Sequence, residues 1–263
     1  MDLIERLQSY MRETAREQYE AERIPPFTAF FHPRDMLTYL NYAVPDEPAG
    51  GDLGQAVARL RGAYRARVRR PRLEFIEEFA PDLAPSLRAA GLGEEARQPL
   101  MVCTRETWRA GPEVPGLTIG VLTADSPLDA IKESLATNEL GFNPKGSGVF
   151  SDEDAERYRR GLVGNRAFTA YLHGSAAGAG MYNPPRDGLA ELVGIATLEP
   201  LRRRGVATAL TAEMARVAFG LGVEVAFLTA ADEGASRVYE RVGFRRVATM
   251  LAYIEPLELN AKR

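Results

Sequence analysis

The sequence is poor in the residues that build disulfide-bonded or metal-bound structures. Its 263 residues include one cysteine and two histidines. A single cysteine, Cys103, excludes an intramolecular disulfide framework, and no Cys/His cluster has metal-ligand spacing, so we expect no metal ion. Cys103 lies in the apolar run 99–103, which favours a buried small side chain over a nucleophile.

Long apolar runs and a strong charge imbalance are also missing. No stretch approaches the roughly 18 apolar residues typical of a membrane span, and the charged N-terminus lacks the apolar core of a secretory signal. We therefore expect a cytoplasmic protein without a membrane partner. The 33 basic and 36 acidic side chains leave a net charge of -3, which gives no reason to expect nucleic acid as a partner. The arginine run at 65–72 lacks interleaved aromatic residues and favours a solvated surface over an RNA site.

Hydrophobic periodicity and turn residues predict an α/β chain. In the first half we expect an amphipathic helix that ends before Pro25, strands at 27–31, 40–44, 73–79 and 99–103, and helices at 53–68 and 81–90. In the second half we expect strands at 117–122, 167–172, 176–182, 190–198, 224–229 and 246–254, and helices at 127–140, 207–219 and 234–241. Ser126 and Ser151 have the spacing of helix caps.

The chain length favours two domains rather than one. The turn-rich segment 106–116 is typical of a linker, and we place domains at 1–112 and 113–263. The halves also echo each other: when Gly91 is laid on Gly243, both segments read strand, helix, glycine, strand. An ancient duplication and a chance match both explain so short a correspondence.

The most informative segment is 193–210, where a strand runs into a turn with three arginines and then a helix. The first backbone N–H groups of a helix have no intrahelical partner and can bind phosphate oxygens. Gly205 and Ala207 are small enough to let a phosphate approach the backbone. Without further context, a solvated basic turn would explain the arginines equally well.

Two motifs in the second half resemble those of the GNAT superfamily of N-acetyltransferases. The first is R/Q-x-x-G-x-G/A, the acetyl-CoA-binding motif, which Arg202, Gly205 and Ala207 match. The second is N-x-x-A-x-x-x-Y followed by x-x-x-G-F, which is matched by Asp232, Ala235, Tyr239, Gly243 and Phe244. Two matches in the family's order are more specific than either alone.

This resemblance implies the acyl-CoA N-acyltransferase fold, an α/β fold with a mixed, mostly antiparallel central sheet flanked by helices. It also implies two tandem related halves, of which the first is a degenerate copy. Leu87 stands in the first half where Tyr239 stands in the second, and 46–54 has no arginine-rich turn. We therefore expect the first half to be structural or to shape the acceptor pocket, without catalysis of its own.

The resemblance implies acetyl-CoA as cosubstrate. The strand before the turn would expose backbone groups to the pantetheine arm and the thioester. The residues predicted to bind acetyl-CoA are Ile195, Ala196, Thr197, Arg202, Arg203, Arg204, Gly205, Val206, Ala207, Thr208 and Asp232. Asp232 departs from the family's asparagine and puts the usual side-chain contact to CoA in doubt.

The resemblance also implies two catalytic side chains. Tyr239 matches the family's general-acid tyrosine, which protonates the departing thiolate; a lone tyrosine of this kind would otherwise be a core residue. Glu191 lies an even number of residues before Ile195 and Thr197, so on a regular strand it shares their face. It matches a glutamate that deprotonates the amine in some family members, and a solvated strand residue is the alternative.

The sequence therefore predicts an acetyl-CoA-dependent N-acetyltransferase that moves an acetyl group directly to a primary amine. Segment 126–164 would shape the acceptor site, and it favours a small molecule over a protein without identifying the amine. The alternative is a non-catalytic acyl-CoA-binding or sensing module, which Asp232 keeps open. Oligomeric state is not predicted.

Overall fold

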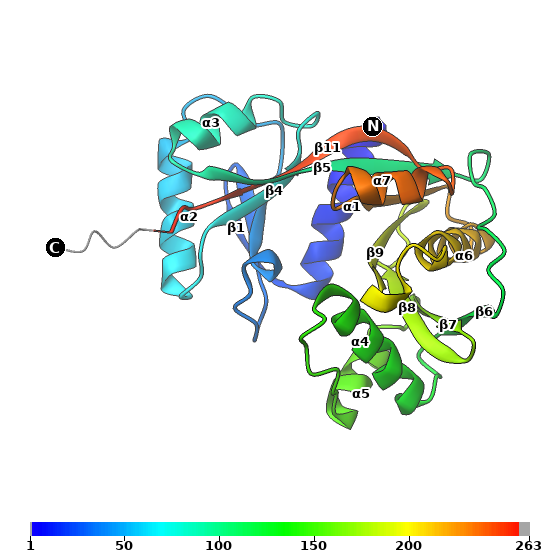
Figure 1. The fold of residues 1–263 in the computed structure, drawn as a ribbon. Helices are drawn as coiled ribbons and strands as arrows, with labels where there is room; N and C mark the ends of the chain where they lie inside the picture. Colours follow the sequence, from blue (N-terminus) through cyan, green and yellow to red (C-terminus); the bar gives the residue numbers. More distant parts are fainter. Residues whose placement is uncertain (1, 258–263) are drawn as a thin grey trace. The chain divides into compact units, whose positions relative to one another are not determined.

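The computed structural model describes residues 2–257 and divides the chain into two compact units (Figure 1). The first unit contains residues 2–99 and 248–257, and the second contains residues 100–247. The compact units therefore divide the chain differently from a single cut at residue 112. The linear division into two related halves stays a prediction.

The first unit is a mixed sheet with helices. Its elements are α1 (Leu3–Gln18), β1 (Glu20–Ile24), β2 (Phe27–Phe31), the 3-10 helix η1 (Thr38–Leu40), β3 (Tyr42–Pro45), α2 (Gly54–Ala66), β4 (Arg72–Ile76), α3 (Leu83–Ala89), the start of β5 (Gly93–Thr104) and most of β11 (Arg245–Ile254). The strand order is β1-β2-β3-β4-β11-β5; β3 and β4 pair in parallel, and β1 with β2, β2 with β3 and β4 with β11 pair antiparallel.

The second unit is also a mixed, mostly antiparallel sheet flanked by helices. Its elements are the end of β5, β6 (Leu117–Leu122), α4 (Leu128–Phe142), α5 (Asp152–Arg160), β7 (Arg166–Leu172), β8 (Ser175–Tyr182), β9 (Leu189–Thr197), the 3-10 helix η2 (Glu199–Leu201), α6 (Val206–Gly220), β10 (Val225–Thr229), α7 (Glu233–Glu240) and the start of β11. The strand order is β5-β10-β9-β8-β7-β6, with β9 and β10 parallel. The predicted fold class is confirmed.

Each half of the chain gives its last strand to the other half's sheet. β11 pairs with β4, with Met250 opposite Ile76, and β5 pairs with β10, with Cys103 opposite Ala226. The sequence predicts both strands but not their partners. This exchange is why no single cut separates the compact units.

The echo between the halves is present in the backbone. β4, α3, Gly91 and β5 follow one another in the first half, as β10, α7, Gly243 and β11 do in the second. Gly91 has φ 89° and Gly243 has φ 101°. Both glycines stand just past a helix in the left-handed conformation, which side chains with a Cβ adopt at a cost.

Three local predictions differ in outcome. The opening helix ends at Gln18, before Pro25 as predicted, and 20–24 forms the edge strand β1 against β2, which the sequence did not predict. Ser126 does not cap α4; its Oγ accepts a hydrogen bond from the Thr123 N–H at 2.9 Å. Ser151 caps α5 in a capping box with Asp154, as predicted.

Each unit has its own apolar core. In the second unit, α6 packs on the sheet with Leu210, Met214 and Phe219 buried. Cys103 is fully buried in this core, and burial raises the pKa of its thiol. The prediction of a packing role for Cys103 is confirmed, because a buried protonated thiol is a poor nucleophile.

The arginine run of the first unit binds neighbouring groups of the chain. Arg72 is buried and pairs with Glu74 and Glu95. Arg67 pairs with Glu22 at 2.8 Å, and its guanidinium lies 4.2 Å from the centre of the Phe31 ring. These contacts pair two of the five arginines of the run with groups of the same unit. Across residues 2–257, every helix is too short or too polar to pass through a bilayer.

The glycine after α7 has far less room than its counterpart after α3. A Cβ at Gly243 would lie 1.8 Å from the Thr107 carbonyl oxygen, whereas a Cβ at Gly91 would meet only Arg61 Nη2 at 3.5 Å. We expect Gly243→Ala to lower the free energy of unfolding by about 3 kcal/mol or more, and Gly91→Ala by about 1 kcal/mol.

The single tryptophan reports on the unit that holds Gly243. Trp108 packs against its core, and its Nε1 donates to the Ala212 carbonyl at 3.0 Å, so its fluorescence follows denaturant unfolding of this unit. Gly220→Ala is the control, because a Cβ there has nothing within 4 Å and no positive φ. Equal midpoints for the Gly243 and Gly220 variants would contradict the steric argument.

Candidate active site

The strand that leads into the arginine turn contains a β-bulge. Met181 lies opposite Val193 and Ala179 opposite Ala196, so one residue of β8, Gly180, faces two of β9, Gly194 and Ile195. Gly194, in the bulge, has φ 64°, and its carbonyl accepts a hydrogen bond from Asn138 Nδ2 of α4 at 2.5 Å. The bulge inserts one residue and reverses the alternation of faces along β9.

The bulge corrects the predicted orientation of Glu191. With the extra residue, Glu191 shares a face with Ala196 instead of with Ile195 and Thr197. A methyl group at Gly141 of α4 would lie 2.7 Å from Ala196 Cβ, which identifies this face as the one toward α4. The Glu191 carboxylate accepts a hydrogen bond from Asn183 Nδ2 at 2.9 Å.

β9 separates from β10 after Glu191, just before the bulge. Their pairing ends at Glu191 opposite Phe227, although β9 continues to Thr197 and β10 to Thr229. The Leu198 N–H donates to the Ala177 carbonyl, so by antiparallel alternation Ala196 directs its backbone groups to β8. Thr197, one residue earlier than Leu198, directs its backbone groups to the open side.

The turn after β9 is held by its first arginine. Arg202 Nε donates to the Thr197 carbonyl at 3.2 Å, and Arg202 Nη2 donates to the Gly141 carbonyl at 2.8 Å. The guanidinium thus ties the end of β9 to the end of α4. Arg203 has φ 61° and Gly205 has φ 83°, and left-handed residues in such a turn direct backbone N–H groups into an anion-binding concavity.

The start of α6 is open at this turn. Gly205 is its N-cap, and no side chain caps the helix. The first intrahelical hydrogen bond runs from the Ala209 N–H to the Gly205 carbonyl. The N–H groups of Val206, Ala207 and Thr208 are therefore without intrahelical acceptors, and the helix dipole favours an anion in front of them.

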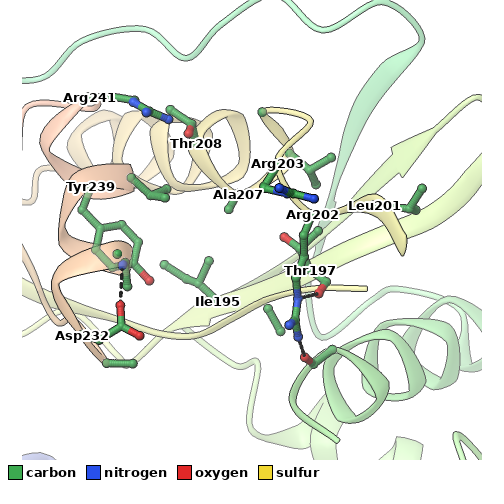
Figure 2. Close-up of a pocket in the computed structure, with 18 of the residues that line it drawn as sticks. Ile195, Thr197, Leu201, Arg202, Arg203, Ala207, Thr208, Asp232, Tyr239 and Arg241 are labelled. Carbon is green, nitrogen blue, oxygen red and sulfur yellow. Dashed lines mark hydrogen bonds between the residues drawn. The ribbon is translucent and has the colours of Figure 1, made fainter. Parts of the chain in front are cut away.

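A pocket of about 690 Å³ lies between this turn, β9 and α7 (Figure 2). Of the residues predicted to bind acetyl-CoA, all but Arg204 line it; Glu191 does not. The lining residues that the motifs did not single out are Gly141, Phe142, Leu201, Ala231, Gly234, Val238 and Arg241. Gly141 and Phe142 come from α4, more than 50 residues before the turn, and nothing in the sequence signals their presence here.

The α7 wall of the pocket begins at Asp232. Its Oδ1 accepts a hydrogen bond from the Ala235 N–H at 2.8 Å and caps the helix. Ala235, which belongs to the second motif, and Val238 follow at three-residue intervals, so helical spacing could also have predicted Val238. The carboxylate departs from the family pattern, and in this chain it is engaged in the cap.

Tyr239 lies on the same helix and turns its hydroxyl into the pocket (Figure 2). Its ring packs on Phe244 with centroids 6.2 Å apart. Burial, and secondarily the charge of Asp232, raises the pKa of Tyr239 to about 12. The phenol is therefore protonated at neutral pH and can donate a proton but not accept one.

The pocket offers two kinds of backbone group to a ligand. The unpaired N–H groups of α6 and the left-handed turn suit a diphosphate, and the separated end of β9 offers backbone groups to an extended arm. Among residues 2–257 no group of three or more His, Cys, Asp or Glu side chains is placed to hold a metal ion.

Comparisons with known proteins bear on the family. Residues 134–244 match the acetyltransferase (GNAT) family. A GCN5-related N-acetyltransferase from Kribbella flavida is 23% identical, with 97% of this chain and 96% of that chain covered and a TM-score of 0.82. The comparison with curated proteins gives no match.

Two further solved structures share the fold at lower identity. A GCN5-related N-acetyltransferase from Sphaerobacter thermophilus is 17% identical, covering 87% of this chain and 76% of that chain, with a TM-score of 0.64. A tandem GNAT protein from the clavulanic acid biosynthesis pathway is 15% identical, covering 87% and 77%, with a TM-score of 0.63. The fold, the pocket and the family match agree for residues 134–244, which are similar to the acetyltransferase (GNAT) family.

Proposed function

We propose that the second unit binds acetyl-CoA in the pocket of Figure 2 and transfers the acetyl group directly to a primary amine. The observation that carries this proposal is the presence, in one pocket, of an uncapped helix start, a separated strand end and a protonated tyrosine. A binding module needs only the first two features.

The chain's own groups would divide the work. The N–H groups of Val206, Ala207 and Thr208 would bind the diphosphate. The Thr197 N–H faces the open side of β9 and would donate a hydrogen bond to the thioester oxygen as negative charge develops there, an effect that can contribute about 3 kcal/mol.

The reaction balances with one proton donor and one proton acceptor. The amine nitrogen forms a bond to the carbonyl carbon, the carbon–sulfur bond breaks, and the thiolate takes the proton of the Tyr239 hydroxyl. The attacking nitrogen loses one proton to the base as the amide forms, and this proton then returns to the tyrosinate through solvent. Glu191 remains the proposed base; since it does not line the pocket, it would act through water.

The raised pKa of Tyr239 predicts the alkaline side of the rate profile. Deprotonation would remove the acid, and a pKa of about 12 moves that loss well above neutral pH. We therefore expect the single-turnover rate not to fall between about pH 8 and 10 on account of Tyr239. Stopped-flow detection of free thiol would measure it. A loss with an apparent pKa near 9 that vanishes in Tyr239→Phe would contradict the assignment.

An amine-library screen with acetyl-CoA and thiol detection tests the function as a whole. Thiol release that requires both acetyl-CoA and one class of amine supports the proposal, and acetylated product identifies the acceptor. Acetyl-CoA binding by calorimetry without turnover on any amine would favour the non-catalytic binding or sensing module.

A further inference from the structure

One cationic side chain of the pocket, that of Arg241, lies outside the arginine turn. Arg241 follows α7 directly, is exposed, and lines the pocket from the α7 side (Figure 2). It forms no ion pair with any of residues 2–257. An arginine without a carboxylate partner in a pocket wall is available to an anionic group of a ligand.

The other arginines of the pocket are used or placed differently. The Arg202 guanidinium already donates to two backbone carbonyls, and Arg204 is not among the lining residues. Arg203 belongs to the turn itself, beside the N–H groups of α6. The pocket therefore offers an anion site at the turn and one further guanidinium, that of Arg241 at the end of α7.

The charge of the side chains on the α7 side of the pocket changes from negative to positive along the helix. Asp232 caps its first turn, and Arg241 follows its last, nine residues later, or about 13 Å along a helix axis. A phosphate would be repelled at the Asp232 end and attracted at the Arg241 end. The wall thus favours a ligand whose second anionic group lies on the Arg241 side.

Resting on the proposed function, we propose that Arg241 recognises the phosphomonoester that coenzyme A carries on its ribose, apart from its diphosphate. The diphosphate would occupy the N–H groups of α6, and Arg241 would select thioesters of coenzyme A over those of dephospho-coenzyme A. Arg241 is then a specificity-determining residue that takes no part in the chemical step.

Calorimetry with acetyl-CoA and acetyl-dephospho-CoA tests this on the full chain. We expect wild type to bind the dephospho compound about tenfold more weakly. In Arg241→Gln the affinity for acetyl-CoA should fall about tenfold while that for the dephospho compound stays, so the preference disappears. Arg241→Lys should keep part of the preference for acetyl-CoA over acetyl-dephospho-CoA.

Arg245→Gln is the matched control. It removes the same charge four residues away, on a side chain that lines a separate cleft with Thr107 and Arg109, so its preference should equal that of wild type. An equal loss for both thioesters in Arg241→Gln would show that Arg241 binds the diphosphate and would overturn the proposal. A preference for acetyl-CoA in Arg241→Gln equal to that of wild type would also overturn the proposal. If wild type binds neither thioester, the proposed function itself fails.

Discussion

Tyr239→Phe should lower the single-turnover rate of acetyl transfer by about 10²-fold or more while acetyl-CoA affinity changes little. The substitution removes one hydroxyl and keeps the ring that packs on Phe244, so the loss would report the proton donor and not the packing. Single-turnover measurement with acetyl-CoA already bound avoids a rate limited by product release.

Tyr158→Phe is the matched control for this prediction. Burial also raises the pKa of Tyr158 to about 12, but its hydroxyl donates to Met181 Sδ at 3.4 Å and it does not line the pocket. Tyr158 belongs to segment 126–164, which we expect to shape the acceptor site, so the comparison is made at saturating amine; this variant loses a comparable buried hydroxyl outside the pocket and should keep the wild-type rate. If both variants lose activity equally, the effect is structural; if Tyr239→Phe keeps the wild-type rate, water or another side chain supplies the proton.

The parts of the site that the sequence predicts are local in the chain. A strand, a turn with Gly205 and a following helix lie within 18 residues, and the rule that a helix start binds anions needs no knowledge of the rest. The second motif predicts α7, with Asp232 at its N-cap and Tyr239 seven residues later, about two turns along the helix. These elements form because short-range spacing determines them.

What the sequence misses depends on distant or irregular backbone. The bulge at Gly194 shifts the face of Glu191, and no periodicity rule anticipates one inserted residue. Phe142 enters the pocket wall because Arg202 ties α4 to β9 across 61 residues. The exchange of β5 and β11 likewise follows from strand pairing that alternating apolar residues do not specify.

The structure also changes which residue of the turn should be mutated to test phosphate binding. A Cβ at Gly205 would lie 3.0 Å from Val114 Cγ2, and its φ of 83° strains any side chain. A substitution there would disturb the turn and confuse folding with binding. Ala207, the second residue of α6, lines the pocket and has ordinary helical backbone.

Ala207→Asp should therefore weaken acetyl-CoA binding by about 10²-fold or more. Its carboxylate would stand where the diphosphate meets the helix, and two like charges about 4 Å apart at a protein surface repel by several kcal/mol. An aspartate in the first turn of a helix is itself favourable to the helix dipole, so the fold should be retained. Calorimetry at low ionic strength measures the affinity.

Ala207→Asn separates charge from size, because it has the shape of the aspartate without its charge. We expect it to lose no more than about tenfold in affinity, and added salt to narrow the gap between the two variants as the repulsion is screened. Equal losses for Asp and Asn would mean that crowding alone is responsible. Wild-type affinity in a folded Ala207→Asp protein would show that the diphosphate does not bind at the start of α6, and the open N–H groups there would need another ligand.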